Sequence, residues 1–311
     1  MAEPVALLAL ALDAVCGWPE RLYRRIGHPV GLFARQIAAC ERRWNRADTA
    51  PARRRAAGIA TLLLLLLTSA GGAALIETGL RHALGGAAWP LLALLAAPAL
   101  AQRSLAEHVR PVADALGTGD LPCARAAVGR IVGRDTAPLD SAGVARAAIE
   151  SLAESFCDGV VAPLFWLLLL GLPGLWAYKA VNTADSLIGH REPRWRDFGW
   201  AAARLDDLLN LLPARLAGVL ICLAGGGWRT MLADARRHAS PNAGWPEAAM
   251  AGALGLRLGG PLAYDGAMQD KPWIGTGRTG AGAPDIRRAL TLYGRASAAL
   301  WIVAGGAAWL R

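Results

Sequence analysis

The sequence predicts an all-α, polytopic integral membrane protein with about four to six membrane helices, one of which is a candidate re-entrant helix. Of its 311 residues, 54% are hydrophobic, and the mean hydropathy is positive, at +0.32. The apolar residues also come in blocks rather than in the periodic stripes of water-soluble helices. Blocks of this kind are typical of helices that enter a bilayer.

Six apolar segments are candidates for these helices, at residues 4–15, 58–76, 87–100, 160–178, 208–223 and 290–310. Several are shorter than the roughly 20 residues that a perpendicular span needs. We therefore expect some to be tilted, re-entrant or buried in protein. We treat residues 1–311 as one membrane-embedded domain, with a soluble helical insertion at about 102–155 and a cytoplasmic segment rich in Gly and Pro at about 225–289.

The charged residues predict an orientation. The first apolar segment follows Glu3, contains Asp13 and has no basic region before it, which argues against a cleaved signal. The net charge of +9 comes mostly from arginine and shows no aromatic and basic pattern of nucleic-acid binding. The densest basic loop, residues 35–55, is expected in the cytoplasm by the positive-inside rule, and the N-terminus outside.

Three carboxylates precede the fourth apolar segment. Glu150, Glu154 and Asp158 are spaced i, i+4, i+8, which places them on one face of a helix. This spacing suits Mg²⁺, which takes one or two carboxylates together with phosphate and water. The alternative is a solvated face on which Glu150 pairs with Arg146. The position of the row at a membrane boundary favours a functional site.

Two residues nearer the N-terminus are candidates for substrate contacts. Arg134 lies shortly before a helix that we expect to begin near Ser141, where it could clamp a phosphate, although such arginines also form ordinary salt bridges. His28, in a His-Pro pair, could act as a general base or contact a phosphate, but a loop histidine is often incidental.

The apolar segment 160–178 is interrupted at Gly171-Leu172-Pro173-Gly174. If it crossed the membrane fully, the polar residues on either side of it would lie on opposite sides of the bilayer. A re-entrant hairpin that turns at this break would keep both on the cytoplasmic side, and we prefer it. Non-helical backbone at that depth requires cover by protein or water.

A second polar group follows that segment. Asn182, Asp185 and Ser186 share a helical face near Lys179. The next helix adds three charged residues, which are Arg204, Asp206 and Asp207. The alternative is a juxtamembrane charge belt in which Lys179 extends toward the headgroups.

The segment 240–261 is rich in small residues, which permit close approach of the backbone to a ligand or to another helix. Its flat or polar groups are Asn242, Trp245 and Glu247, and packing alone is an equal alternative. No Walker A or Rossmann pattern occurs in the sequence, and the five cysteines lack metal-ligand spacing.

Together these segments resemble the adenosylcobinamide-phosphate synthase (CobD/CbiB) family of cobalamin biosynthesis. The matching stretches occur in the family's order, at residues 10–35, 149–166, 177–191, 197–216 and 240–261. One departure is Gly17-Trp18-Pro19, where the family often has Gly-Asp-Pro. The resemblance implies a multi-pass enzyme of the bacterial inner membrane with a cytoplasmic active site. It would join adenosylcobyric acid to (R)-1-aminopropan-2-ol phosphate, or to the free amino alcohol, by ATP-dependent amide ligation.

The resemblance and the chemistry together give expected roles. Mg²⁺ would be held by Glu150, Glu154 and Asp158, with Asp206 or Asp207. Phosphates would be bound by Lys179 and Arg204, and the general base would be Asp185 or His28. Other substrate contacts are expected from Asn182, Ser186, Arg134 and Asn242, with Trp245 as the wall of the corrinoid cavity. Expected partners are membrane lipid and other late membrane enzymes of the pathway, and not nucleic acid.

Two other functions use the same residues. A transporter with intramembrane carboxylates predicts matching broken helices in two halves, and the sequence shows one break and no repeat. A Mg²⁺-dependent transferase acting on a lipid phosphate would need the same acids beside a groove that faces the lipid.

Overall fold

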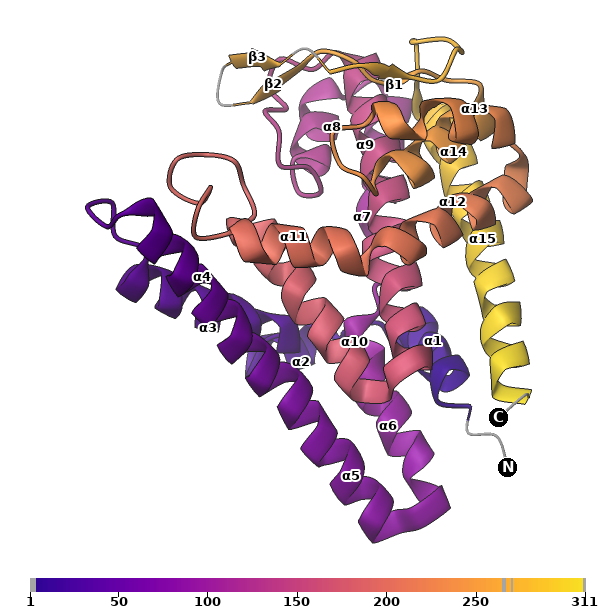
Figure 1. Ribbon diagram of the computed structural model, residues 1–311. Coiled ribbons are helices and arrows are strands. Elements are labelled where there is room, and N and C mark those ends of the chain that lie inside the picture. The colour runs from indigo at the N-terminus through magenta and orange to yellow at the C-terminus, as the bar shows by residue number, and fades with distance from the viewer. Residues whose placement is uncertain (1–3, 265–266, 270, 310–311) are drawn as a thin grey trace. The chain divides into compact units, whose positions relative to one another are not determined.

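The computed structural model describes residues 4–264, 267–269 and 271–309, and these are mostly helical, which confirms the predicted all-α class (Figure 1). The chain forms two compact units. Unit 1 comprises Met1–Ala101, Ala162–Asn210 and Ala304–Arg311, and unit 2 comprises Gln102–Val161 and Leu211–Val303. That the whole chain acts as one domain in the membrane stays a prediction.

The helices of unit 1 come from two stretches of the chain. They are α1 (Val5–Cys16), α2 (Glu20–Ile26), α3 (Pro29–Trp44), α4 (Pro51–Leu66), the π-helix η1 (Leu67–Gly71), α5 (Gly72–Leu84), η2 (Gly85–Ala88), α6 (Trp89–Ala96), η3 (Ala97–Ala99), α10 (Ala162–Ile188) and α11 (Trp200–Leu209).

In the described part of the chain, unit 2 contains the other helices and the short strands. They are α7 (Gln102–Gly117), α8 (Leu121–Val128), α9 (Ser141–Phe156), the π-helix η4 (Cys157–Val161), α12 (Leu211–Gly225), α13 (Trp228–Asp234), η5 (Ala235–Arg237), α14 (Gly244–Leu254), β1 (Leu258–Gly259), β2 (Leu262–Tyr264), β3 (Ala267–Gln269), β4 (Trp273–Ile274) and most of α15 (Ala283–Trp309).

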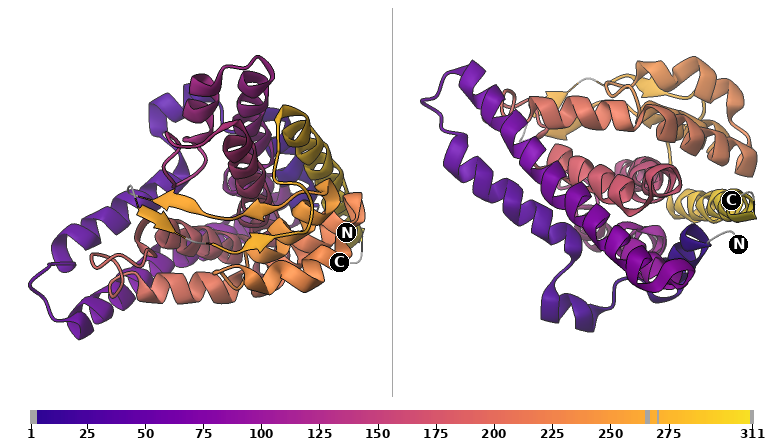
Figure 2. Two further views of the ribbon diagram at one scale, coloured as in Figure 1. Left: turned by 90° about the horizontal axis from the view of Figure 1, so that it is seen from above. Right: turned by 60° about the horizontal axis from the view of Figure 1, so that its bottom comes forward.

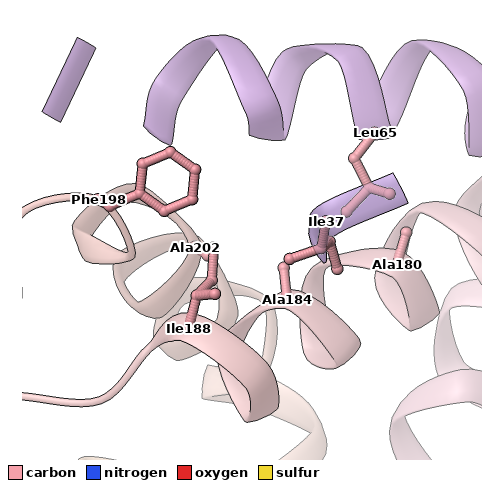
Figure 3. Close-up of a cluster of buried hydrophobic side chains, with 7 residues drawn as sticks. All are labelled: Ile37, Leu65, Ala180, Ala184, Ile188, Phe198 and Ala202. Carbon is pink, nitrogen blue, oxygen red and sulfur yellow. The ribbon is translucent and has the colours of Figure 1, made fainter. Parts of the chain in front are cut away.

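A buried apolar cluster holds α3, α4, α10 and α11 of unit 1 together (Figure 3). Small residues let the backbones come close, and Gly58 is one that the packing requires. A Cβ on Gly58 would lie 1.8 Å from the backbone oxygen of Phe198. The cluster consists of Ile37, Leu65, Ala180, Ala184, Ile188, Phe198 and Ala202.

The expected segments 58–76 and 87–100 lie on successive helices of unit 1. The helices α4, η1 and α5 follow one another as a long rod (Figure 2, right). The chain then turns back through η2 into α6. The turn begins at Gly85, whose φ of 54° favours glycine.

The predicted break in the fourth apolar segment is confirmed at Gly171. Its φ of 67° and ψ of −155° lie in a region open only to glycine and divide α10 into two helices. The N–H of Leu172, which begins the second half, donates to Glu77 Oε2 of α5 over 2.9 Å. Arg81 in turn donates to Glu77 Oε1 over 3.0 Å. A carboxylate therefore satisfies the backbone where the helix is interrupted.

Unit 2 also contains two short antiparallel strand pairs that the sequence did not predict (Figure 2, left). In the first pair, Leu258 of β1 lies opposite Ile274 of β4, and the second pair joins β2 to β3. Strands of two or three residues leave no alternating pattern to recognise in a sequence. The first pair contacts α14, and β1 also contacts α9.

Among the residues that the structure describes, two helical ranges could cross a membrane by length and composition, Pro51–Gly117 and Ser141–Ile188. A third is added if the bent pair Trp200–Leu209 and Leu211–Gly225 counts as one span. This number is lower than four to six because segments 58–76 and 87–100 fall in one range and α1 has only 12 residues. Leu310, the end of the sixth expected segment, lies outside the described residues.

Candidate functional site

A polar cavity of about 160 Å³ lies within unit 2. Its lining combines carboxylates of α9 and α14 with basic side chains from the loops before α9, α14 and β4. The lining residues are Arg134, Glu150, Glu154, His238, Ala239, Glu247, Gly259, Lys271, Pro272 and Ile274. Helix α9 begins, as predicted, at Ser141, because the Asp140 side chain accepts from the N–H of Gly143 over 2.6 Å. One turn of α9 separates Glu150 from Glu154, so both reach the cavity.

Both carboxylate oxygens of Glu150 accept hydrogen bonds from protein groups. Its Oε2 accepts from Arg134 Nη2 over 2.5 Å, and its Oε1 accepts from the N–H of Gly259 over 2.8 Å. The Arg134 and Glu150 side chains are only 10% and 6% exposed. The alternative pairing with Arg146 is wrong, since Arg146 donates to the carbonyl of Thr279 over 2.7 Å and lies over the Trp273 ring. Glu150 thus joins α9 to β1 and to Arg134.

Glu154 is the carboxylate of the predicted row that remains available to a ligand. It is exposed. It lines the cavity with Arg134 and Lys271, and both cations act on it electrostatically. Within the described ranges it makes no direct hydrogen bond or ion pair. A carboxylate in this position can bind a cation or a metal-bound phosphate.

Asp158 does not line the cavity with the other two acids. It lies in η4, half-buried, where the helix widens into a π-turn. Such a turn changes the angular step between successive residues, so the regular i, i+4, i+8 row expected from the sequence does not continue through it. The charge of Asp158 still acts on Glu154.

Two titratable groups of the cavity, Glu247 and His238, were given no role from the sequence, although Glu247 was noted among the polar groups of the segment 240–261. Glu247 of α14 is 5% exposed, and its Oε1 lies 3.7 Å from His238 Nε2. His238 Nδ1 accepts from the N–H of Ser240 over 3.0 Å, so in the neutral ring Nε2 carries the proton and faces Glu247. No spacing signal could have joined these residues to α9, because they approach it from distant segments.

Burial and neighbouring charges shift both of these groups. Burial, followed by the nearby charges of Glu150 and Glu154, raises the pKa of Glu247 well above its usual value. Burial, and then the charge of Lys271, lowers the pKa of His238. The cavity therefore disfavours an ionised Glu247 and a protonated His238 unless a ligand changes the balance.

Asn242 and Trp245 are held by Arg215 of α12 and lie outside the cavity lining. Arg215 Nη1 donates to Asn242 Oδ1 over 3.0 Å, and its guanidinium lies 4.8 Å from the centre of the Trp245 ring. Both residues fix the packing of α12 on the start of α14. Contact with a substrate stays a prediction for them.

A second polar cluster lies within unit 1, around Asp206 of α11. Its two oxygens accept from Asn210 Nδ2 over 3.0 Å and from Asn182 Nδ2 over 3.3 Å. The Tyr178 hydroxyl donates to Asn210 Oδ1 over 3.0 Å. Asp185 of α10 acts electrostatically on Asp206. Asn182 of α10 thus lies beside Asp206 within this unit, and the charge of Asp185 acts on the same carboxylate.

The other predicted residues of unit 1 lie around this cluster or at the surface. Ser186 is exposed and donates to the carbonyl of Asn182 over 2.9 Å. Arg204 and Asp207 form a surface pair, 3.8 Å apart, with the Arg204 side chain 70% exposed. A surface pair of this kind contributes little to stability.

His28 is the N-cap of α3, where its Nδ1 accepts from the N–H of Val30 over 3.2 Å. Burial, and then the charge of Lys179, lowers its pKa, so the ring is neutral at pH 7. With Nδ1 accepting, Nε2 carries the proton and presents a donor. This tautomer favours a binding role for His28 over a general-base role.

The donor set is compatible with Mg²⁺ only in combination with a phosphate ligand. No three His, Cys, Asp or Glu side chains of the described ranges converge to hold a metal by themselves. Mg²⁺ commonly uses one or two carboxylates and takes its remaining ligands from phosphate and water. Glu154, beside Arg134 and Lys271, fits that requirement.

Comparison with known proteins gives one consistent result. The family model described as CobD/Cbib protein matches residues 6–293. A cobalamin biosynthesis protein CobD of Rhodobacter capsulatus is 48% identical over 306 residues, which cover 96% of this chain and 95% of the relative. CobD proteins of a Sinorhizobium species and of Brucella suis are 48% and 47% identical, over 94% and 93% of this chain and 95% and 91% of the relatives. No solved structure matches the chain.

The family match covers almost the whole chain, including both polar clusters, and the relatives have similar lengths. The chain therefore belongs to the CobD/Cbib family of cobalamin biosynthesis.

Proposed function

We propose that this protein is an adenosylcobinamide-phosphate synthase. It would join the carboxylate of adenosylcobyric acid to the amine of (R)-1-aminopropan-2-ol phosphate, or of the free amino alcohol, with ATP as the co-substrate. Family membership supports an enzyme of cobalamin biosynthesis. The observation that carries the ligase assignment is the Glu154 carboxylate, which has no direct partner in the described ranges and shares a cavity with Arg134 and Lys271.

The chemistry explains why such a cavity is needed. A carboxylate does not condense with an ammonium group at neutral pH, so ATP would first convert it to an acyl phosphate. The amine would then form the C–N bond, the C–O bond to phosphate would break, and the amine would lose a proton. Lys271 and Arg134 would bind the phosphate oxygens, and their charges would stabilise the negative charge that moves onto them.

Mg²⁺, when bound, would neutralise phosphate charge and orient the phosphate groups. Glu154 is the side chain best placed to hold it, because Glu150 would first have to leave Arg134 and Gly259. We therefore give Glu150 a positioning role. Asp158, Asp206 and Asp207 stay predicted ligands, and Lys179 and Arg204 stay predicted phosphate contacts.

For the proton on the amine, Asp185 stays the predicted base from unit 1, since His28 presents a donor. We also propose that the protein resides in the bacterial inner membrane, with its active site toward the cytoplasm and Trp245 in the wall of the corrinoid site. Holding the product near other late membrane enzymes of the pathway would be one benefit of this location.

ATP consumption tests this proposal against a transporter and against a lipid-phosphate transferase. Purified protein should hydrolyse ATP stoichiometrically with amide formation, and only when adenosylcobyric acid and the amine are both present. ATP turnover that needs neither substrate would refute the ligase assignment. Turnover that depends on a lipid phosphate would favour the transferase.

A further inference from the structure

We infer that the cavity of unit 2 binds the ammonium group of the amine substrate and that Glu247 is the carboxylate that holds it. This inference rests on the proposed function and assigns one end of one substrate to a named residue.

The cavity has a surplus of acid. Its lining contains the carboxylates Glu150, Glu154 and Glu247, against the permanent cations Arg134 and Lys271. Arg134 is used by Glu150 in a buried ion pair. With Glu247 neutral the charges of the lining balance, and ionisation of Glu247 leaves one negative charge in excess, which one further cation would neutralise.

Glu247 is the acid that most needs such a charge. It is 5% exposed, and in the described ranges the only direct polar contact of its side chain is with His238 Nε2, at 3.7 Å, beyond hydrogen-bond distance. Buried carboxylates are normally paired or hydrogen-bonded, because burial removes their hydration. The raised pKa of Glu247 has the same cause, since burial and the charges of Glu150 and Glu154 both disfavour its ionised form.

A primary ammonium group matches this environment. It carries three N–H donors and no acceptor, so it can satisfy Glu247 and reach a second carboxylate, Glu154, in the same cavity. Ala239, Pro272 and Ile274 supply an apolar wall for a short carbon chain. About 160 Å³ admits a small amino alcohol and is far too small for a corrinoid ring. Lys271 and Arg134 lie in the same lining, where they could contact a phosphate on the other end.

The experiment measures binding of 1-amino-2-propanol to the purified full-length protein by calorimetry, with 1,2-propanediol as the uncharged analogue. The wild type should bind the amine and not the diol. Glu247→Gln, which keeps the shape and removes the charge, should weaken amine binding at least ten-fold. Glu107→Gln, in an exposed pair with Arg103 on α7, is the matched control and should bind like the wild type.

A second variant guards against a fold defect. If Glu247→Gln fails to elute as a monodisperse species, Glu247→Asp keeps the charge and shortens its reach, and it should weaken amine binding by a smaller factor. Equal amine affinity in wild type and Glu247→Gln, or equal affinity for amine and diol, would overturn the inference. The inference would also be overturned if Mg²⁺ alone displaced the amine from the wild type, and if Glu247→Gln lost Mg²⁺ binding but still bound the amine. Glu247 would then be a metal ligand and not the ammonium site.

The outcome is separable from the proposed function. Amide formation by the wild type together with normal amine binding by Glu247→Gln would refute only the assignment of Glu247. If amine binding depends on Glu247 but the wild type makes no amide with sound substrates, the ligase assignment is refuted. The assignment of Glu247 as the ammonium-binding residue then still stands.

Discussion

The ion pair between Arg134 and Glu150 is a buried interaction that positions the cavity. Removing one partner leaves the other charge in a site with little water, which costs about 3–5 kcal/mol in comparable cases. Arg134→Met should therefore lower the thermal midpoint of the purified protein clearly. Arg103→Met removes an exposed partner of Glu107 and should change stability by less than about 1 kcal/mol.

Both variants can be compared by thermal unfolding in one detergent. Equal midpoints for Arg134→Met and the wild type would contradict the structural role of the pair.

The carboxylate row of Glu150, Glu154 and Asp158 could be predicted from the sequence only in part. The helical spacing of Glu150 and Glu154 was readable, but the partners of Glu150 come from the loop before α9 and from β1.

Glu247 predicts a pH effect on stability. A group whose pKa is raised by folding contributes stability fully below its unfolded pKa, here about 4.5, and loses it as the pH rises through the folded pKa. Without substrate, the thermal midpoint of the wild type should therefore fall relative to that of Glu247→Gln as the pH is raised from below 4.5. The groups that face Glu247 are His238, Glu150, Glu154, Arg134 and Lys271.

The comparison is a series of melting curves for the two proteins at matched pH values. Because both contain the same other titratable groups, the difference isolates Glu247. A difference that stays constant with pH, or that grows in favour of the wild type, would show that Glu247 is not destabilised by ionisation.

At the scale of the elements, the break in α10 depends on Gly171. A side chain there would be strained, at about 1–3 kcal/mol for such a backbone conformation, and its Cβ would lie 2.7 Å from Glu77 Oε2. Gly171→Ala should lower the thermal midpoint. Gly79→Ala is the matched control, because Gly79 lies in helix α5 with nothing within 4 Å of an added Cβ, and it should leave the midpoint unchanged or raise it.

If both alanine variants melt alike, the break does not depend on the conformation of Gly171.

The position of this break was predictable, because Gly and Pro are strong local signals within an apolar run. Its partner was not predictable. Glu77 lies on α5, 95 residues before Leu172, and its role appears only when α5 packs against α10.

For the whole molecule, the topology can be tested by finding on which side of the membrane Ser186 lies. If the segment turns back at Gly171, Ser186 and the basic loop at residues 35–55 lie on the same, cytoplasmic side. The exposed cysteines, Cys16 and Cys123, are first replaced by Ser. Ser186→Cys and, separately, Asp48→Cys should then resist an impermeant maleimide in spheroplasts and react in inverted vesicles.

Labelling of Ser186→Cys only from the periplasm would rule out the re-entrant arrangement.

The sequence could predict the fold class and the family, because apolar blocks and several long motifs in the family's order are both properties of the linear chain. It could not predict that Glu247 and His238 meet α9, since this proximity depends on how α14 and the loop before it pack.

As proposed, the protein forms an amide bond with the help of the Glu154 carboxylate. Mass spectrometry of the products from purified protein, adenosylcobyric acid, aminopropanol phosphate and Mg-ATP tests it most directly, with Glu154→Gln beside Glu107→Gln. We predict that the wild type and Glu107→Gln make the amide and that Glu154→Gln, folded to the same extent, loses at least 100-fold in rate, which is within the roughly 10²–10³ range for one electrostatic contact to a transition state. Amide formation by Glu154→Gln at the wild-type rate, or none by the wild type with sound substrates, would contradict it.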